Sequence, residues 1–142
     1  MAESSTRLLP CPTPETEIWW DSCRQHRLLI QYCPDCGRHQ FYPRTLCAAC
    51  LGGNPEWVEA SGLATVETFT ICRIPVSAAY AAQLPYVVAI VRLEEGPTMM
   101  TNIVGCDPAS VAIGMPVAVV FENWSDEITL PQFRPRHGAA QR

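Results

Sequence analysis

Two Cys-x-x-Cys motifs constrain this chain more than any other feature of its sequence. Cys33 and Cys36 form the first motif, Cys47 and Cys50 form the second, and ten residues separate them. Each motif can place its two sulfur atoms along one edge of a tetrahedron, and a hairpin would bring the two edges together. Paired motifs outside a secreted context predict a metal site rather than two disulfides. We therefore predict one Zn²⁺ bound by four thiolates. Because no coordination position is left for water or substrate, the ion is expected to be structural.

The length and the apolar pattern limit the class of protein. A chain of 142 residues forms one domain, or a small metal module attached to one modest domain. No apolar run approaches the roughly 20 residues that a membrane helix needs, and the first residues lack the pattern of a signal peptide. Four further cysteines are scattered among small or apolar neighbours. We expect a protein of the reducing cytoplasm with no membrane segment.

The charge balance bears on nucleic-acid binding, which is common among zinc ribbons. The chain contains no lysine, and its formal net charge is −4 with the cysteines counted as neutral. Zinc binding removes four thiol protons and adds one divalent cation, so the metal-bound protein is two units more negative. Such a protein gains little from the release of counterions from phosphates. No nucleic-acid partner is expected.

A helix is predicted near the N-terminus. Thr13 is a suitable N-cap, Pro14 suits the first helical position, and the helix should extend to about His26. Trp19 and Trp20 are adjacent, and two adjacent side chains on a helix cannot both face one core. Either one tryptophan lies at the surface, or a partner contacts the helix from its other side.

The remainder of the chain has the pattern of β-structure. One strand leads into the first knuckle over residues 28–33. The following strands are expected at residues 57–60, 63–74, 86–93, 99–104, 116–124 and 128–133. In the 63–74 strand, Val66, Thr68, Thr70 and Cys72 should share one face. Strands of this size and number favour a five-stranded oligonucleotide/oligosaccharide-binding (OB) barrel.

The expected fold is therefore mainly β. It comprises an N-terminal segment and helix (residues 1–27), a rubredoxin-like zinc ribbon (28–56), and an OB-fold domain with a C-terminal tail (57–142).

No catalytic set is visible in the sequence. His26, His39 and His137 are not placed beside a plausible nucleophile, and Cys72 and Cys106 are lone cysteines of the kind that usually serve as small buried hydrophobes. No Gly-rich phosphate loop is present. These residues indicate an accessory or binding module, with no catalytic residue assigned.

Short motifs stand in a specific order between residues 13 and 135. They are Pro14, Glu17 and Trp19-Trp20; Phe41-Tyr42-Pro43-Arg44 between the cysteine pairs; Gly62-Leu63-Ala64-Thr65-Val66 with Phe69-Thr70; Pro85-Tyr86-Val87-Val88-Ala89; Glu95-Gly96; Thr101-Asn102-Ile103-Val104; and Ile113-Gly114-Met115-Pro116-Val117. In this order they closely resemble the DUF35 family of zinc-ribbon OB-fold proteins associated with acyl-CoA metabolism. The resemblance covers nearly the whole chain, and all four zinc-binding cysteines are present.

The resemblance implies a partner. DUF35 proteins are typically small partners of thiolase-superfamily enzymes, including thiolases of aromatic degradation and thiolase-like aldolases that shorten steroid side chains. It implies that the partner carries the catalytic residues, while the DUF35 chain stabilises the complex and helps to form the acyl-CoA channel. We expect an accessory subunit of a complex that makes or breaks a carbon–carbon bond in a CoA thioester, with two copies of each chain.

The resemblance also directs attention to particular side chains. Phe41 and Tyr42 offer apolar walls for a pantetheine or acyl chain, and Arg44 could bind a phosphate. The alternative is that the two rings fill the small ribbon core while Arg44 is a solvated charge. Candidates for the partner interface are Trp19, Trp20 and Phe133.

Two other functions remain open from the sequence. A ribbon joined to an OB barrel could bind nucleic acid, although that function favours basic, aromatic strands. A self-sufficient CoA-dependent acyltransferase or hydrolase is the other alternative, and it requires a nucleophile and a base that the sequence does not display.

Overall fold

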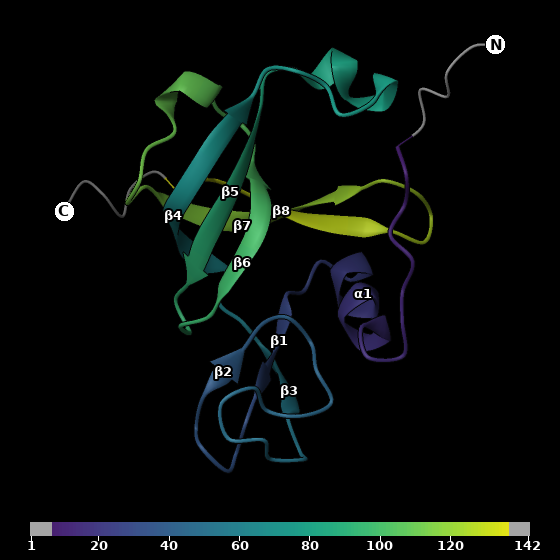
Figure 1. Cartoon of the computed structure of the whole chain (residues 1–142), viewed down its shortest axis with the longest axis vertical. Coiled ribbons are helices and arrows are strands. Elements are labelled where there is room, and N and C mark those ends of the chain that lie inside the picture. Colours follow the sequence, from purple (N-terminus) through teal and green to yellow (C-terminus); the bar gives the residue numbers. More distant parts are fainter. Residues whose placement is uncertain (1–6, 137–142) are drawn as a thin grey trace.

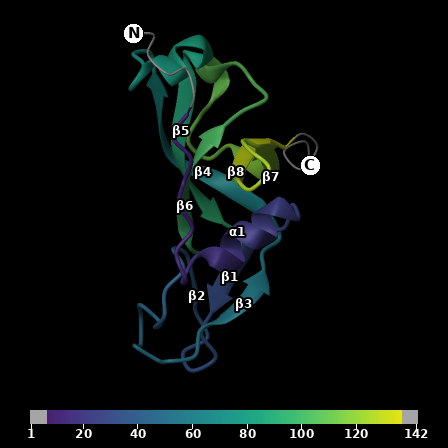
Figure 2. The ribbon, with the colours of Figure 1, turned by 90° about the vertical axis from the view of Figure 1, so that its right-hand side faces the viewer.

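Strands dominate the computed structural model, which describes residues 7–136. His137, one of the three histidines considered above, lies outside the described residues. The elements are α1 (Glu17–Arg24), β1 (Leu29–Tyr32), β2 (His39–Gln40), β3 (Glu56–Glu59), β4 (Leu63–Cys72), β5 (Tyr86–Leu93), β6 (Thr98–Ile103), β7 (Pro116–Asn123) and β8 (Thr129–Pro135), with short 3₁₀ helices η1 (Ala78–Gln83) and η2 (Pro108–Ser110). Figures 1 and 2 show the barrel at one end of the molecule and the ribbon at the other, with α1 beside their junction. None of the described helices has the length and apolar character to span a membrane.

Helix α1 begins later than the sequence predicts. Residues 14–16 form a turn, and the Thr13 carbonyl accepts hydrogen bonds from the N–H groups of Thr16 and Glu17. The predicted start at Thr13 and Pro14 is therefore wrong by about one turn. Thr16 occupies the N-cap position, but its side chain makes no capping bond and instead contacts the backbone of Thr13.

The C-terminus of α1 falls where the sequence predicts. His26 adopts a left-handed conformation (φ 57°), and the Arg27 N–H donates to the Ser22 carbonyl while the His26 N–H donates to the Cys23 carbonyl. This is a Schellman arrangement, which satisfies two carbonyls at the helix end. Cys23 is fully buried, and burial raises the pKa of its thiol to about 12, so this thiol stays neutral.

The ribbon contains a three-stranded antiparallel sheet in the order β2-β1-β3. Strand β3, which we expected to open the OB-fold domain, pairs with β1 so that Ile30 lies opposite Val58. By its hydrogen bonding β3 therefore belongs to the ribbon sheet. Strand β2 pairs with β1 over only two residues, so β3 supplies most of the pairing of β1.

The other five strands form a closed barrel in the order β4-β5-β6-β8-β7. Neighbours are antiparallel except β6 and β8, which are parallel and meet at Ile103 and Phe133. The barrel closes because β7, the last strand in this order, pairs with β4, with Ala118 opposite Leu63. This closed five-stranded architecture confirms the predicted OB-like barrel.

A β-bulge in β4 changes which side chains face the barrel core. Val66 lies opposite Val91 and Thr68 lies opposite Ile90, so Glu67 is the extra residue. After the bulge the alternation is inverted, and Phe69 and Ile71 pack against the core. The prediction that Thr68, Thr70 and Cys72 continue the face of Val66 is therefore wrong.

Phe133 lies at the centre of the barrel core. Its side chain is fully buried among other apolar groups, including Val66, Val87, Val91 and Val117. A ring in this position cannot present itself to a partner at the surface of the chain. The expectation that Phe133 contributes its ring to an interface does not fit this position, because β8 directs that side chain inward.

Candidate metal centre and adjoining surface

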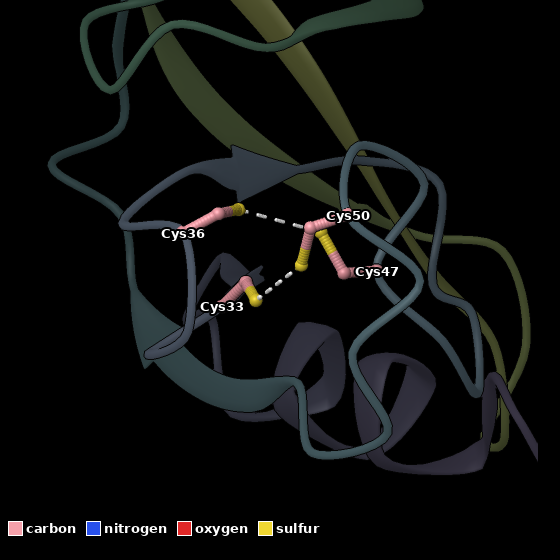
Figure 3. A group of neighbouring side chains, drawn as sticks. All are labelled: Cys33, Cys36, Cys47 and Cys50. Atoms are coloured by element: carbon pink, nitrogen blue, oxygen red, sulfur yellow. Dashed lines mark hydrogen bonds between the residues drawn. The ribbon is translucent and has the colours of Figure 1, made fainter.

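The four cysteines of the two motifs converge as predicted. Their sulfur atoms all lie within 4.8 Å of one another, as Figure 3 shows. The Cys33 and Cys50 sulfurs are 3.6 Å apart, as are those of Cys36 and Cys47. A tetrahedral Zn²⁺ with Zn–S bonds of about 2.3 Å separates its sulfur ligands by about 3.8 Å. The geometry therefore fits a four-thiolate zinc site and not a disulfide, and all four cysteines are free thiols.

The two knuckles have the same backbone hydrogen bonds. In the first, the Gly37 N–H donates to the Cys33 carbonyl, and the Cys33 N–H donates to the Arg38 carbonyl. In the second, the Leu51 N–H donates to the Cys47 carbonyl, and the Cys47 N–H donates to the carbonyl of the residue after Leu51. The residue after the second cysteine takes a positive φ in both, 75° for Gly37 and 66° for Leu51.

The knuckles approach each other closely at Gly52. A Cβ on Gly52 would lie 2.5 Å from Asp35 Oδ2 and 3.3 Å from the Cys50 sulfur. Real Cβ contacts of 2.5 Å do not occur, so this position requires glycine if Asp35 of the first knuckle keeps its place. The role of Gly52 in this approach is visible only in the folded site.

The electrostatics of the site favour a bound cation. The backbone N–H groups of Cys50 and Ala49 lower the pKa of the Cys47 thiol to about 6. The Gly52 N–H favours the Cys50 thiolate too, but contacts with the other three thiols, together with burial, outweigh it and raise the Cys50 pKa to about 12. Adjacent thiols cannot all ionise without a compensating charge, and Zn²⁺ supplies that charge. The donor set, its spacing and its electrostatics all suit a structural zinc ion.

A buried amide, missed by the sequence analysis, holds the loop between the knuckles. Gln31 is only 4% exposed, and its Oε1 accepts from the Arg44 N–H and from Gln40 Nε2 at 2.8 and 2.7 Å. Its Nε2 donates to the Arg44 carbonyl at 2.8 Å. Gln40 Oε1 in turn accepts from the Ala48 N–H. The alternating pattern of residues 28–33 could have marked Gln31 as inward-facing, but not its partners.

Four aromatic rings form a continuous series from α1 into the ribbon loop. Trp20 and Trp19 lie 4.6 Å apart between ring centroids, Trp19 and Phe41 lie 5.7 Å apart, and Phe41 and Tyr42 lie 6.2 Å apart. The structure thus brings together two of the three predicted interface residues and two of the three predicted substrate-facing residues. We call these four residues the aromatic series.

Exposure differs along the aromatic series. Trp19 is buried and Phe41 is partly buried, whereas Tyr42 is 55% exposed and Arg44 is also exposed. The side chains of Ile18 and Leu46 are about half exposed. Trp19 packs inward while Trp20 is only partly covered, so a single core does not bury both.

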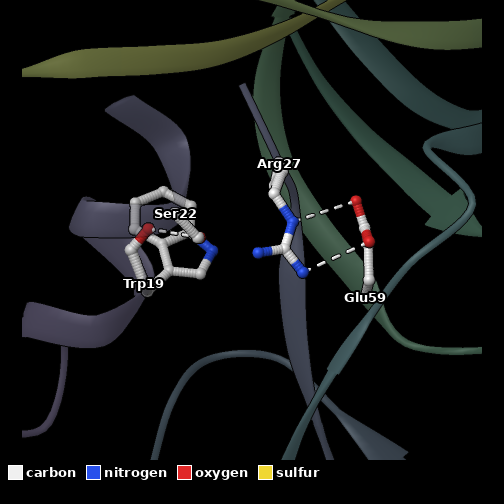
Figure 4. Close-up of polar contacts among 4 residues, drawn as sticks. All are labelled: Trp19, Ser22, Arg27 and Glu59. Carbon is white, nitrogen blue, oxygen red and sulfur yellow. Dashed lines mark hydrogen bonds and ion pairs between the residues drawn. The ribbon is translucent and has the colours of Figure 1, made fainter. Parts of the chain in front are cut away.

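The end of α1 is tied to the ribbon sheet by an ion pair. Both nitrogens Nε and Nη2 of Arg27 lie 3.3 Å from the carboxylate of Glu59 in β3, as drawn in Figure 4. On the helix, the Ser22 hydroxyl donates to the Trp19 carbonyl at 2.7 Å. The Trp19 Nε1–H is buried and has no hydrogen-bond partner within the described residues. The exposed ion pair joins the end of α1 to the ribbon sheet, the Ser22 bond is internal to the helix, and the Trp19 indole donor is left unsatisfied by the described residues.

The described residues contain no hydrogen bond or ion pair between a histidine side chain and a cysteine nucleophile. The His26 ring stacks on Phe121 at 5.2 Å, and His39 packs beside Tyr32. Cys72 lies near the Tyr86 hydroxyl. The pKa of Tyr86 is raised, mainly by burial and then by the neighbouring Cys72. No catalytic residue is assigned on this chain.

Comparisons with known proteins bear on the family. Residues 20–56 match the model of the ChsH2 rubredoxin-like zinc ribbon domain, and residues 57–122 match that of the ChsH2 C-terminal OB-fold domain. A DUF35 domain-containing scaffold protein from Methanothermobacter thermautotrophicus is 33% identical over 81% of this chain and 86% of its own length. This chain belongs to the DUF35 family.

Two further proteins similar to this DUF35 chain carry functional names. A probable enoyl-CoA hydratase alpha subunit from Thermomonospora curvata is 37% identical over 89% of the chain, which spans 39% of that relative's length. The solved structure named Ltp2-ChsH2(DUF35) aldolase is 35% identical over 89% of this chain and 98% of its own, with a TM-score of 0.81. The chain thus spans about two-fifths of the hydratase-named relative and nearly all of the matched chain of the aldolase structure.

Proposed function

We propose that this DUF35 chain is a non-catalytic, accessory subunit of a complex that acts on acyl-CoA thioesters, with a thiolase-superfamily enzyme as its partner. In this proposal the partner performs the carbon–carbon bond chemistry. The DUF35 chain stabilises it and helps to form the channel for the acyl-CoA. The proposed assembly contains two copies of each chain in the cytoplasm.

The observation that carries the proposal is the likeness to the structure named Ltp2-ChsH2(DUF35) aldolase, a name that joins two components. That likeness extends over 98% of the matched chain at a TM-score of 0.81. The relatives named hydratase alpha subunit and scaffold protein point the same way, since both names describe parts of larger assemblies. The sequence search for a catalytic set in this chain found none, which agrees with a partner that supplies the reacting groups.

We place the partner contact on the surface formed by Ile18, Tyr42 and Leu46, which are all about half exposed. Tyr42 is the exposed end of the aromatic series, in which its ring packs against the partly buried Phe41 and Phe41 packs against the buried Trp19. Interfaces are enriched in tyrosine and tryptophan anchors supported in this way.

We place the acyl-CoA contact at the adjoining loop. The Arg44 side chain is exposed, while its backbone N–H and carbonyl are both held by Gln31. An arginine on a fixed backbone is suited to a phosphate group, because its planar guanidinium can bind two oxygens at once. Phe41 and Tyr42 provide apolar walls beside it.

Capture of the partner tests the proposal directly. Tagged chain is used to recover proteins from its native lysate, and the recovered complex is identified by mass spectrometry and sized by light scattering. Recovery of a thiolase-superfamily protein in equal amount supports the proposal, and a mass equal to two copies of each chain supports the stoichiometry. Recovery of nucleic acid alone, or thioester turnover by the purified chain alone, contradicts it.

Matched variants locate the contact. Tyr42→Ala removes an exposed apolar side chain from the proposed surface, and Ile113→Ala removes one that is 71% exposed on a barrel loop. We expect Tyr42→Ala to weaken partner binding about tenfold or more, as for a central interface aromatic. Ile113→Ala should leave binding unchanged. Equal effects of the two variants would place the contact elsewhere.

A further inference from the structure

The barrel contains a pocket that four separate segments of the chain line. None of these segments includes a residue of the metal centre. Its volume is about 320 Å³, and its lining comes from the loop between β4 and β5, from β5 and β6, and from the end of β7 with the following loop and β8. Figure 1 shows the η1 loop and the β7–β8 hairpin on the same side of the barrel. In OB folds, the face of the second and third strands and these two loops form the ligand-binding surface. We call this the barrel pocket.

Aromatic side chains form much of the barrel pocket. Tyr80 of η1 and Tyr86 of β5 have ring centroids 6.0 Å apart, and Trp124 lines the opposite loop. The Arg7 guanidinium carbon lies 4.1 Å from the centroid of the Trp124 ring and covers one face of it. Arg7 Nη2 also lies 3.6 Å from Glu122 Oε1. This ion pair compensates the one carboxylate among the lining residues.

Two polar groups in the barrel pocket lack hydrogen-bond partners within the described residues. Gln132 lines the pocket and is only 7% exposed, yet its amide makes no hydrogen bond to the described chain. The Trp124 Nε1–H is buried and has no partner. Both groups can donate. The buried indole N–H costs free energy while it has no acceptor, whereas the Gln132 amide retains access to the solvent of the pocket. A ligand that offers carbonyl oxygens would satisfy both.

The lining and the mouth of the pocket narrow the class of ligand. No lysine or arginine is among the lining residues, and Arg7, which covers Trp124, is already paired with Glu122, so a phosphate-bearing ligand such as a nucleotide or CoA has no unpaired cation to bind there. At the mouth, Val76 is 78% exposed, and Ile74 two residues earlier is 82% exposed. These apolar side chains continue beyond the cavity, where a small molecule would not cover them but a peptide would.

We propose that the barrel pocket binds an extended, uncharged, proline-containing peptide segment of a protein partner. A polyproline II segment has no internal hydrogen bonds, so its carbonyls are free to accept from the Trp124 indole and the Gln132 amide. Tyrosine and tryptophan rings are the usual walls for proline rings in such grooves. This site does not depend on the ribbon surface or on the thiolase partner proposed above.

A blocked peptide of about ten prolines is a suitable probe, because it forms a polyproline II helix without charges. The purified zinc-loaded chain is titrated with it, and binding is followed by the NMR signals of the tryptophan indole N–H groups. We expect a saturable shift of the Trp124 indole signal and of backbone signals in η1, β5 and β6. A glycine-serine peptide of the same length is the control ligand.

Three variants make the test specific. Trp124→Phe keeps an aromatic side chain but removes the indole N–H donor, and Tyr80→Ala removes a loop side chain outside the barrel core. Each should weaken binding about tenfold, while Trp57→Phe, in the ribbon sheet, should not. The proposal is overturned if no saturable shift occurs at millimolar peptide, if neither pocket variant weakens binding, or if the shifts lie on another surface. Preferential binding of a neutral small molecule or of a second copy of the chain would also overturn it.

Discussion

The ribbon and the barrel are both β-structures, but different interactions hold them together. In the barrel, Val66, Val91, Val117 and Phe133 are almost completely buried in one apolar cluster. In the distal ribbon, residues 32–55, the buried positions are Pro43 and the metal ligands Cys33 and Cys47. A segment that buries so little apolar surface cannot offset the entropy of its own ordering. The barrel is thus stabilised by its hydrophobic core and the distal ribbon by its metal and a buried amide.

The largest expected effect is that of metal removal. A chelator should unfold residues 32–55 and leave the barrel folded, because zinc binding contributes about 10–16 kcal/mol of coupled folding free energy to such modules. Hydrogen exchange before and after chelation, alongside a metal count of one zinc per chain, measures this. Cys47→Ala should reproduce the effect, whereas Cys11→Ala, at an exposed cysteine outside the site, should not. A ribbon that stays protected without metal would remove the proposed distinction.

The barrel should respond instead to loss of its core. Phe133→Ala is expected to lower the free energy of unfolding by about 3–5 kcal/mol, because it leaves a large cavity at the centre of the cluster. Denaturant unfolding of the zinc-loaded protein measures the change. Ile113→Ala, on an exposed barrel loop, should remain within about 0.5 kcal/mol of the parent. A change below about 1 kcal/mol at Phe133 would mean that the barrel does not depend on this ring.

Loss of the buried Gln31 amide should lower the stability of the ribbon. Gln31→Leu keeps the size of the side chain but removes the partner of the Arg44 N–H and carbonyl, and one of the two acceptors of Gln40 Nε2. We expect a loss of about 1–3 kcal/mol and faster exchange of the Arg44 N–H, with zinc retained. Gln25→Leu, at an exposed glutamine, is the matched control. Loss of zinc in Gln31→Leu would instead make the amide part of the metal site's stability.

The two knuckles offer the finest comparison. Leu51 and Gly37 hold the same left-handed position, but only glycine adopts it without strain. Because the Leu51 side chain is 73% exposed and packs little, Leu51→Gly should stabilise the loaded ribbon by roughly 0.5–1 kcal/mol. Gly37→Leu should destabilise it by a similar amount. Competition with a zinc chelator measures both, and effects of the same sign would show that the knuckles are not equivalent.

Much of the architecture was predictable because it rests on local pattern. The spacing of the four cysteines specifies a tetrahedral site whichever way the chain runs between them. Turn residues and apolar alternation located most of the strands. The candidate residues Phe41 and Tyr42 were found from a resemblance, and their place in the aromatic series came from the structure.

The features that the sequence did not reveal share one physical cause, which is pairing between distant segments. The bulge at Glu67 inverts the faces of β4, and only the register with β5 reveals it. The pairing of β3 with β1 extends the ribbon sheet past residue 56, although the two family models divide between residues 56 and 57, as the sequence predicts. The inward direction of Phe133 depends on the barrel closing between β6 and β8. The start of α1 is a local exception, since residues 14–16 form a turn in place of a helical start.

The sequence by itself determined that this chain has a four-thiolate metal ribbon and a small barrel, because ligand spacing and strand periodicity are local properties. Only the tertiary structure decided which side chains meet: Gln31 with Arg44, Trp19 with Phe41, and the four segments that enclose the barrel pocket. Such contacts depend on loop closure and strand register, which no short stretch of sequence encodes.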